Sequence, residues 1–80
     1  MADLYLYGAA YCHLCDEMRA ALAPLAAELN LTVHWVEIDE HPELEEKFRE
    51  KIPVLVFQDQ EICHYHLDEQ ALRSHLDAVS

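Results

Sequence analysis

Cys12 and Cys15 are the residues of this sequence best suited to chemistry. They are separated by two residues, between a short apolar run and a long helical pattern. A dithiol at a strand-to-helix junction is the sequence form of a thiol–disulfide site. At the start of a helix, free N–H groups and the positive dipole end favour a Cys12 thiolate. Cys15 lies one turn further on the same helix face and would close a disulfide with it.

The neighbours of the dithiol have opposing effects on the thiols. A cationic His13 would help to stabilise a Cys12 thiolate, but the same residue could equally be a solvated loop position. Asp16 and Glu17 would raise the pKa of a nearby thiol, and no Lys or Arg precedes Arg19. The reactivity of Cys12 therefore stays open at this point.

Other roles for the cysteines are possible. They could be two structural core residues, or part of a non-enzymatic adaptor that keeps a redox fold. A zinc or copper site could combine the dithiol and His13 with Cys63, His64 and His66, because thiolate and imidazole suit these metals. However, a single C-x-x-C is a weak zinc signal, and alternate residues of a strand point to opposite faces. We predict no metal site. Cys63 is expected to be a small apolar residue of the core.

The elements that position the dithiol follow from hydrophobic periodicity. We predict strands over about 3–7, 32–38, 54–57 and 61–65, and helices over about 13–29, 42–50 and 69–78. Asp68 suits the N-cap of the last helix, whose apolar stripe is Leu72, Leu76 and Val79. Pro24 is expected to kink the first helix, with a break near Ala23 as the alternative.

The element order β-α-β-α-β-β-α predicts an α/β fold. A β-α-β unit requires its two strands to be parallel with a right-handed crossover, and the 54–65 hairpin adds antiparallel strands. The sheet would therefore be four-stranded and mixed, flanked by three helices, in one domain over residues 1–80. The 3–7 strand is apolar on both faces, which indicates a central strand covered on both sides.

Three features together resemble the glutaredoxin-like branch of the thioredoxin-fold superfamily, and in particular a group of small bacterial glutaredoxin-like proteins. They are the Tyr11–Cys15 stretch after the first strand, Ile52-Pro53 directly before the third, and the element order. The resemblance implies a thiol–disulfide oxidoreductase that maintains cell redox balance. Cys12 would be its nucleophile and Cys15 its resolving thiol, with no bound cofactor beyond the redox-active disulfide.

The resemblance also implies a substrate-binding surface. The Ile52–Pro53 peptide bond would be cis, and the backbone beside it would pair with a substrate chain. Tyr11 and His13 would flank this surface, with Asp68 as a weaker contributor. Trp35 and Tyr65 are more simply interpreted as core or strand packing.

Glutathione is a possible but disfavoured partner. Members of the family that bind it carry a basic residue before the dithiol, and a glycine pair plus an acid after the last strand. Here 8–10 is uncharged, and the bulky 63–66 stretch occupies the place of the glycines, although Asp68 could correspond to the acid. The substrate would be a disulfide-containing protein or a small disulfide. Glutathione and a flavoenzyme reductase both remain open as the electron donor. The resemblance also implies an alternative, an iron–sulfur cluster held by Cys12 from two chains, which would need glutathione and is disfavoured for the same reasons.

Charge and composition restrict the partners and the compartment. The net charge is -11, from 16 acidic and 5 basic residues, which repels nucleic acid and anionic lipid. Three cysteines are a poor disulfide framework, and residues 1–3 do not read as a signal peptide. We therefore expect a monomer in the reducing cytoplasm.

Overall fold

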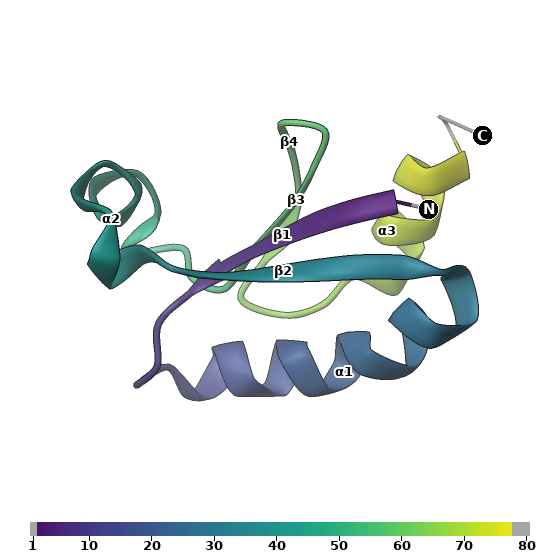
Figure 1. The fold of residues 1–80 in the computed structure, drawn as a ribbon, viewed down its shortest axis with the longest axis horizontal. Coiled ribbons are helices and arrows are strands. Elements are labelled where there is room, and N and C mark those ends of the chain that lie inside the picture. The colour runs from purple at the N-terminus through teal and green to yellow at the C-terminus, as the bar shows by residue number, and fades with distance from the viewer. Residues whose placement is uncertain (1, 78–80) are drawn as a thin grey trace.

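The computed structural model describes residues 2–77 and contains all seven predicted elements in the predicted order. Their bounds are β1 (Ala2–Gly8), α1 (His13–Leu29), β2 (Leu31–Glu37), α2 (Pro42–Phe48), β3 (Val54–Phe57), β4 (Gln60–His64) and α3 (Glu69–Asp77), as Figure 1 shows. Compared with the prediction, element ends differ by at most two residues. Val79, predicted for the last apolar stripe, lies outside the described residues.

The four strands form one mixed sheet in the order β2-β1-β3-β4. β1 pairs with β2 in parallel and with β3 antiparallel, and β3 and β4 form the predicted hairpin. The predicted α/β, four-stranded mixed architecture is therefore confirmed. The register places Tyr7 opposite Val54 and Gly8 opposite Glu37, so these residues lie at the same end of the sheet.

One face of the sheet is covered along its whole length, and we call it the closed face. Alternate residues of β1, Leu4 and Leu6, are fully buried there, together with Leu55 of β3. α1 and α3 cover this face with the apolar residues Met18, Leu22, Leu25 and Leu72. This face therefore contains the larger of the two core clusters. Because buried apolar area is the main source of stability, most of the stability of the fold arises here.

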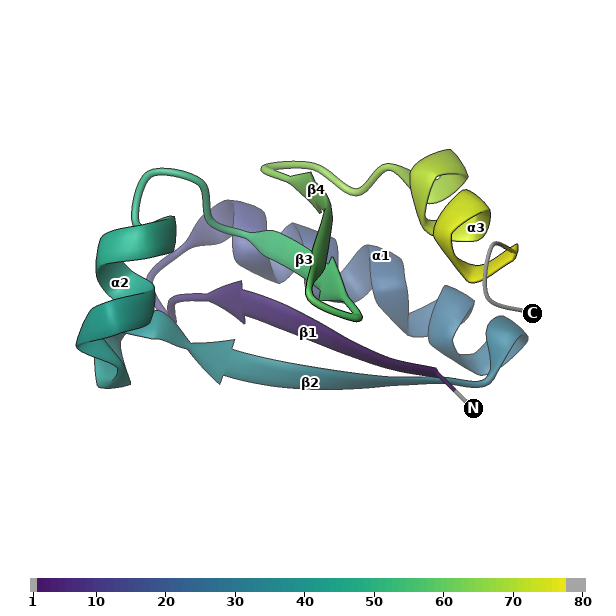
Figure 2. The same ribbon diagram turned by 90° about the horizontal axis from the view of Figure 1, so that it is seen from above.

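The opposite, open face carries Tyr5 and Tyr7 of β1, and α2 covers only one end of it. Phe48 of α2 stacks on Tyr7, with 4.9 Å between ring centroids. Tyr5 is 40% exposed and stacks instead on the half-buried His34. Figure 2 shows α2 at one end of the sheet and α3 near the other.

The prediction that β1 is covered on both sides is therefore wrong for its first half. The reason is length. α2 has seven residues and rises only about 10 Å, whereas the seven residues of β1 extend about 23 Å. An apolar strand pattern does not reveal how long its covering helix is.

One strand end differs from the sequence interpretation, whereas the first helix continues past Pro24 as expected. Ile38 was predicted at the end of a strand, but it begins a 3₁₀ turn, Ile38–Glu40, that buries its side chain beside Phe48 and Val54. α1 continues without a break through the exposed Pro24 and ends at Asn30, which has φ 56°. Within residues 2–77, no helix is long and apolar enough to cross a membrane.

Candidate functional site

Cys12 lies at the N-cap of α1, at the end of the sheet beneath α2. Its backbone is extended, with φ -90° and ψ 115°, and its Sγ accepts a hydrogen bond of 3.2 Å from the Cys15 N–H. Ser, Thr, Asp or Asn usually fills this position, because a side-chain acceptor satisfies a free N–H of the first turn. Here the half-exposed sulfur is the acceptor, so it is held where the helix favours negative charge.

Cys15 lies beneath Cys12 and is completely buried. Burial, and to a smaller extent the hydrogen bond between this thiol and Cys12, raises the pKa of the Cys15 thiol to about 12. The neutral Cys15 thiol therefore donates to the Cys12 sulfur. Both cysteines are free thiols. The two thiols thus differ in their surroundings: Cys12 is accessible, and Cys15 is shielded and protonated.

Gly8 makes room for Cys15, a role that the sequence interpretation missed. A Cβ at this position would lie 2.7 Å from Cys15 Sγ and 2.7 Å from the Trp35 indole. The φ of Gly8 is not positive, so space and not backbone freedom explains the glycine. The sequence offered one signal, since Gly8 is the only glycine in the chain.

Trp35 packs beside the dithiol from strand β2. Its ring lies under the Arg19 guanidinium, 4.3 Å from the centroid, and its Nε1–H donates to Glu37 at 3.4 Å. The sequence predicted a packing role for Trp35, and the structure gives that packing a location, against Gly8 at the buried side of the site.

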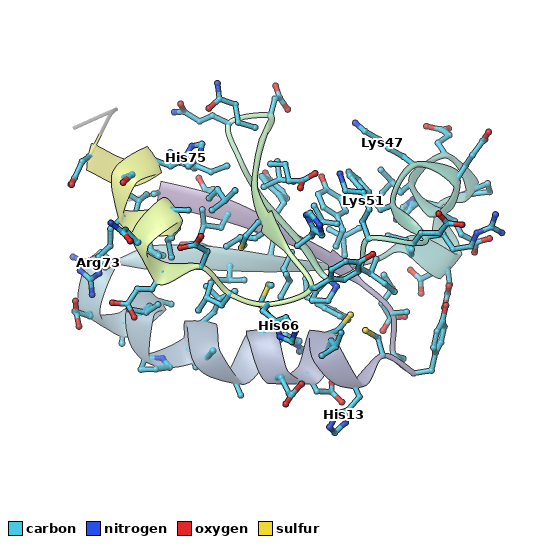
Figure 3. The ribbon with its side chains drawn as sticks, turned by 180° about the vertical axis from the view of Figure 1, so that it is seen from behind. His13, Lys47, Lys51, His66, Arg73 and His75 are labelled. Atoms are coloured by element: carbon cyan, nitrogen blue, oxygen red, sulfur yellow. The ribbon has the colours of Figure 1, made fainter. Side chains whose placement is uncertain are left out.

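Tyr11 and His13, on either side of Cys12, are both exposed. Tyr11 is 74% exposed, and the negative charge of Asp39 raises its pKa, so the 3₁₀ turn lies near it. The His13 side chain points away from the sheet, as Figure 3 shows. Tyr11 is therefore accessible next to Cys12, whereas His13 is turned toward solvent.

The Ile52–Pro53 bond is cis in the structure. Tyr7 pairs with Val54, so Gly8 and Pro53 continue the two antiparallel strands at the site end of the sheet. Pro53 is buried, and the half-buried Ile52 packs against the cluster that contains Phe48. The topology therefore brings the proline to the end of the sheet that carries the dithiol, 38 residues further along the chain than Cys15.

Asp68 caps α3, as predicted. Its Oδ1 accepts a hydrogen bond of 3.0 Å from the Ala71 N–H, and its backbone N–H bonds to the Cys63 sulfur. Cys63 is half-buried against the closed-face core, and burial raises the pKa of its thiol. Among residues 2–77, no group of three or more His, Cys, Asp or Glu side chains is placed to hold a metal ion.

A shallow groove of about 230 Å³ runs between α1 and residues 65–67. It begins at Glu17 and Met18, just after Cys15, and Tyr65 and His66 form its other side. Tyr65 was predicted to pack in a strand, but it follows β4, is 42% exposed and has φ 65°. The sequence held a signal for this left-handed backbone, because residues 63–66 occupy the place where the resemblance implies a glycine pair.

A sequence profile of a known domain family matches almost the whole chain. Residues 3–77 match the family described as glutaredoxin-like domain (DUF836). Protein Ne2328 of Nitrosomonas europaea is 33% identical, with 92% of this chain and 89% of that chain covered and a TM-score of 0.84. Protein XcR50 of X. campestris is 36% identical, with 94% and 96% covered and a TM-score of 0.74.

More distant solved structures share the fold. Thioredoxin 1 of Thermosipho africanus is 13% identical, with 96% of this chain and 97% of that chain covered and a TM-score of 0.66. At that identity the likeness concerns the fold alone. No match was found among curated proteins.

Proposed function

This chain belongs to the glutaredoxin-like domain family, and we propose that it is a thiol–disulfide oxidoreductase with Cys12 as nucleophile and Cys15 as resolving thiol. One observation carries the proposal. The half-exposed Cys12 sulfur accepts hydrogen bonds from both the N–H and the S–H of Cys15. Both bonds stabilise negative charge on Cys12, and the thiolate is the nucleophile in disulfide exchange.

In the first step, the Cys12 thiolate attacks one sulfur of a substrate disulfide. A bond forms between Cys12 Sγ and that sulfur, the substrate S–S bond breaks, and the second substrate sulfur leaves as a thiolate. Tyr11, exposed beside the nucleophile, and the Ile52–Pro53 backbone would contact the substrate chain. The groove of Glu17, Met18, Tyr65 and His66 offers a continuation of that surface.

In the second step, Cys15 resolves the mixed disulfide. Its sulfur attacks Cys12 Sγ, its proton passes to the departing substrate sulfur, and a Cys12–Cys15 disulfide remains. The substrate has then gained two electrons, and the protein has lost two. Because burial holds the pKa of Cys15 at about 12, it stays protonated until the mixed disulfide has formed. The delayed reaction of Cys15 therefore keeps both thiols reduced until a substrate disulfide has reacted with Cys12.

The proposed substrates are disulfides of proteins or small molecules in a reducing cytoplasm. A flavoenzyme reductase or glutathione would return the electrons. The charge of -11 and the bulky Tyr65 favour the reductase over the anionic tripeptide. No resident cofactor is proposed beyond the dithiol.

Thiol counting and insulin reduction test the proposal together. Mild oxidation of the parent protein should remove two of three thiols, and dithiothreitol should restore both. Cys12→Ser should abolish insulin reduction, Cys15→Ser should trap the mixed disulfide, and Cys63→Ser should behave as the parent. Three thiols that resist oxidation, or equal loss of activity in Cys63→Ser, would contradict the proposal.

A further inference from the structure

We propose that Tyr65 is a positioning residue that fixes the Ile52–Pro53 turn against the dithiol. The inference rests on the proposed function, because it assigns Tyr65 a part in substrate binding at that site. Tyr65 follows β4 directly, so it is 50 residues away from Cys15 in the sequence. It makes no covalent chemistry, and its effect would pass through the turn.

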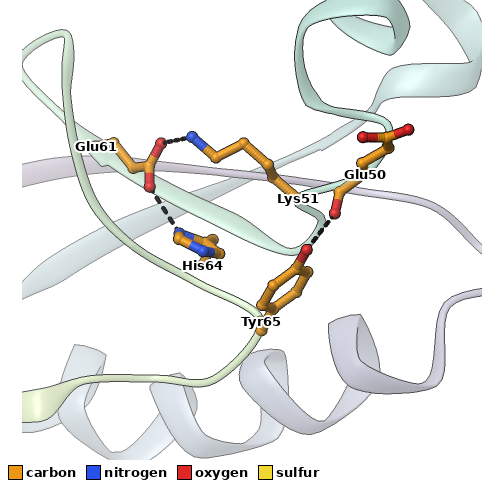
Figure 4. Close-up of polar contacts among 5 residues, drawn as sticks. All are labelled: Glu50, Lys51, Glu61, His64 and Tyr65. Atoms are coloured by element: carbon orange, nitrogen blue, oxygen red, sulfur yellow. Dashed lines mark hydrogen bonds and ion pairs between the residues drawn. The ribbon is translucent and has the colours of Figure 1, made fainter.

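The turn that leads to Pro53 is held from one side by residues 61–65. The Tyr65 N–H donates to the Pro53 carbonyl at 2.9 Å, and the Tyr65 hydroxyl donates to the Glu50 carbonyl. Glu61 binds the Lys51 ammonium through its carboxylate. Figure 4 shows the two side-chain contacts side by side. Tyr65 therefore contacts the turn at two points, before and after Ile52.

The backbone of Tyr65 indicates that its side chain has a specific role. Its φ of 65° lies in the left-handed region, where glycine is preferred because a Cβ is disfavoured there. A glycine could make the same N–H bond to Pro53, but it could not reach the Glu50 carbonyl. The contact that only the tyrosine can make is thus the one through its hydroxyl.

The tyrosine ring is itself held in place. His64 packs edge-on against it, with 4.7 Å between centroids and 72° between planes. The His64 Nδ1 lies 2.8 Å from a Glu61 carboxylate oxygen, and the other Glu61 oxygen binds Lys51. These contacts link strand β4 to the turn through side chains that lie together in Figure 4. The ring orientation, and so the hydroxyl contact, is supported by His64.

The contacts of Tyr65 with the turn should affect substrate binding more than the disulfide exchange itself. Pro53 is next to Gly8 across the sheet, and Gly8 adjoins the Cys15 sulfur. A turn that moves freely would present the Pro53 backbone to a substrate chain less often. The Cys12 sulfur would be unaffected, since its hydrogen-bond partner belongs to α1.

The test compares Tyr65→Phe, Tyr65→Gly and a matched control. Asp59→Gly also replaces a residue with φ 65°, but in the β3–β4 turn. The measurements are KM and kcat for insulin reduction, the alkylation rate of Cys12 by iodoacetamide, and hydrogen exchange of the Lys51 and Tyr65 amides. Loss of one neutral hydrogen bond should raise KM about three- to tenfold in Tyr65→Phe. Tyr65→Gly should raise KM at least as much, with the Cys12 alkylation rate and kcat retained in both variants.

The amides of the turn should exchange about three- to tenfold faster in Tyr65→Phe. This measurement does not depend on turnover. Unchanged exchange in Tyr65→Phe would overturn the inference, and so would an unchanged KM. An equal rise of KM in Asp59→Gly would overturn it as well, because the effect would then be general to the fold. If the parent protein reduces no insulin, the proposed function fails instead, while exchange still decides whether Tyr65 holds the turn.

Discussion

The two faces of the sheet are built differently, although the same strands form both. On the closed face, Leu4 and Leu6 of β1 are fully buried beneath α1 and α3. On the open face, the alternate residues Tyr5 and Tyr7 are covered only where α2 reaches, at Tyr7. A single strand therefore contributes to a continuous core on one side and to a local one on the other.

The difference between the two faces shows which end of the sheet is packed most completely. The closed face supports α1 along its length, so the N-terminus of α1 and Cys12 have a firm base. The open face is covered only at the end where Ile38, Phe48 and Val54 meet, which is also the end of the dithiol. The site end of the sheet is thus packed on both faces, and the far end is packed on the closed face alone.

Leu6→Ala should cause the largest loss of stability. Leu6 is fully buried on the closed face, and removing such a side chain leaves a cavity that costs about 2–5 kcal/mol. Urea unfolding monitored by circular dichroism measures it. A loss no greater than that of a Tyr5 variant would contradict the division between the faces.

Gly8→Ala should cause the next largest loss. The new Cβ would lie 2.7 Å from both the Cys15 sulfur and the Trp35 ring, and overpacking costs about 1–3 kcal/mol. The crowding should also displace Cys15 and slow closure of the Cys12–Cys15 disulfide. Ala10→Gly, at an exposed position of the following loop, is a control without added volume. If the free energy of unfolding and the rate of disulfide closure are unchanged in Gly8→Ala, the packing around Gly8 accommodates an added methyl group and the prediction is wrong.

High pH should lower the free energy of unfolding of the reduced protein, because Cys15 is buried as a neutral thiol. Its pKa is raised from 9.0 to about 12 in the folded protein, so between these values the unfolded chain loses the proton first. The free energy of unfolding should therefore be unaffected below about pH 9 and should fall as the pH rises above it. Cys15→Ala should fall less steeply over the same range. Parallel curves for the two proteins would contradict a buried, neutral Cys15.

Tyr5→Ala should have the smallest effect. Tyr5 is 40% exposed on the open face and loses mainly its stacking on His34, worth about 0.5–1 kcal/mol. Thermal unfolding of this variant beside Leu6→Ala compares adjacent residues of one strand. A loss comparable to that of Leu6→Ala would mean that the open face is covered in solution, for instance by a second molecule.

Local sequence patterns predicted the elements and the dithiol well. The bounds of α1 and β3 agree with the prediction, because apolar spacing and β-branched residues encode the period of each element. Cys12 at the helix start follows from its place after a short strand. The N-cap role of Asp68 also follows from residue type and position alone.

Contacts between distant segments could not be predicted in the same way. The exposure of Tyr5 depends on the length of α2, and the role of Gly8 depends on the indole of Trp35. The left-handed Tyr65 meets the turn before Pro53 through tertiary structure. Each of these facts concerns a neighbour more than ten residues away, about which the period of a pattern carries no information.

The crowding at Gly8 also gives the protein an optical property. Trp35 is the only tryptophan, and its ring and the Cys15 sulfur both fill the space beside one glycine. Nearby thiols and disulfides quench indole emission to different extents. The intrinsic fluorescence of the chain should therefore change when Cys15 changes its bonding partner, which would let an unlabelled sample report its own redox state during titration.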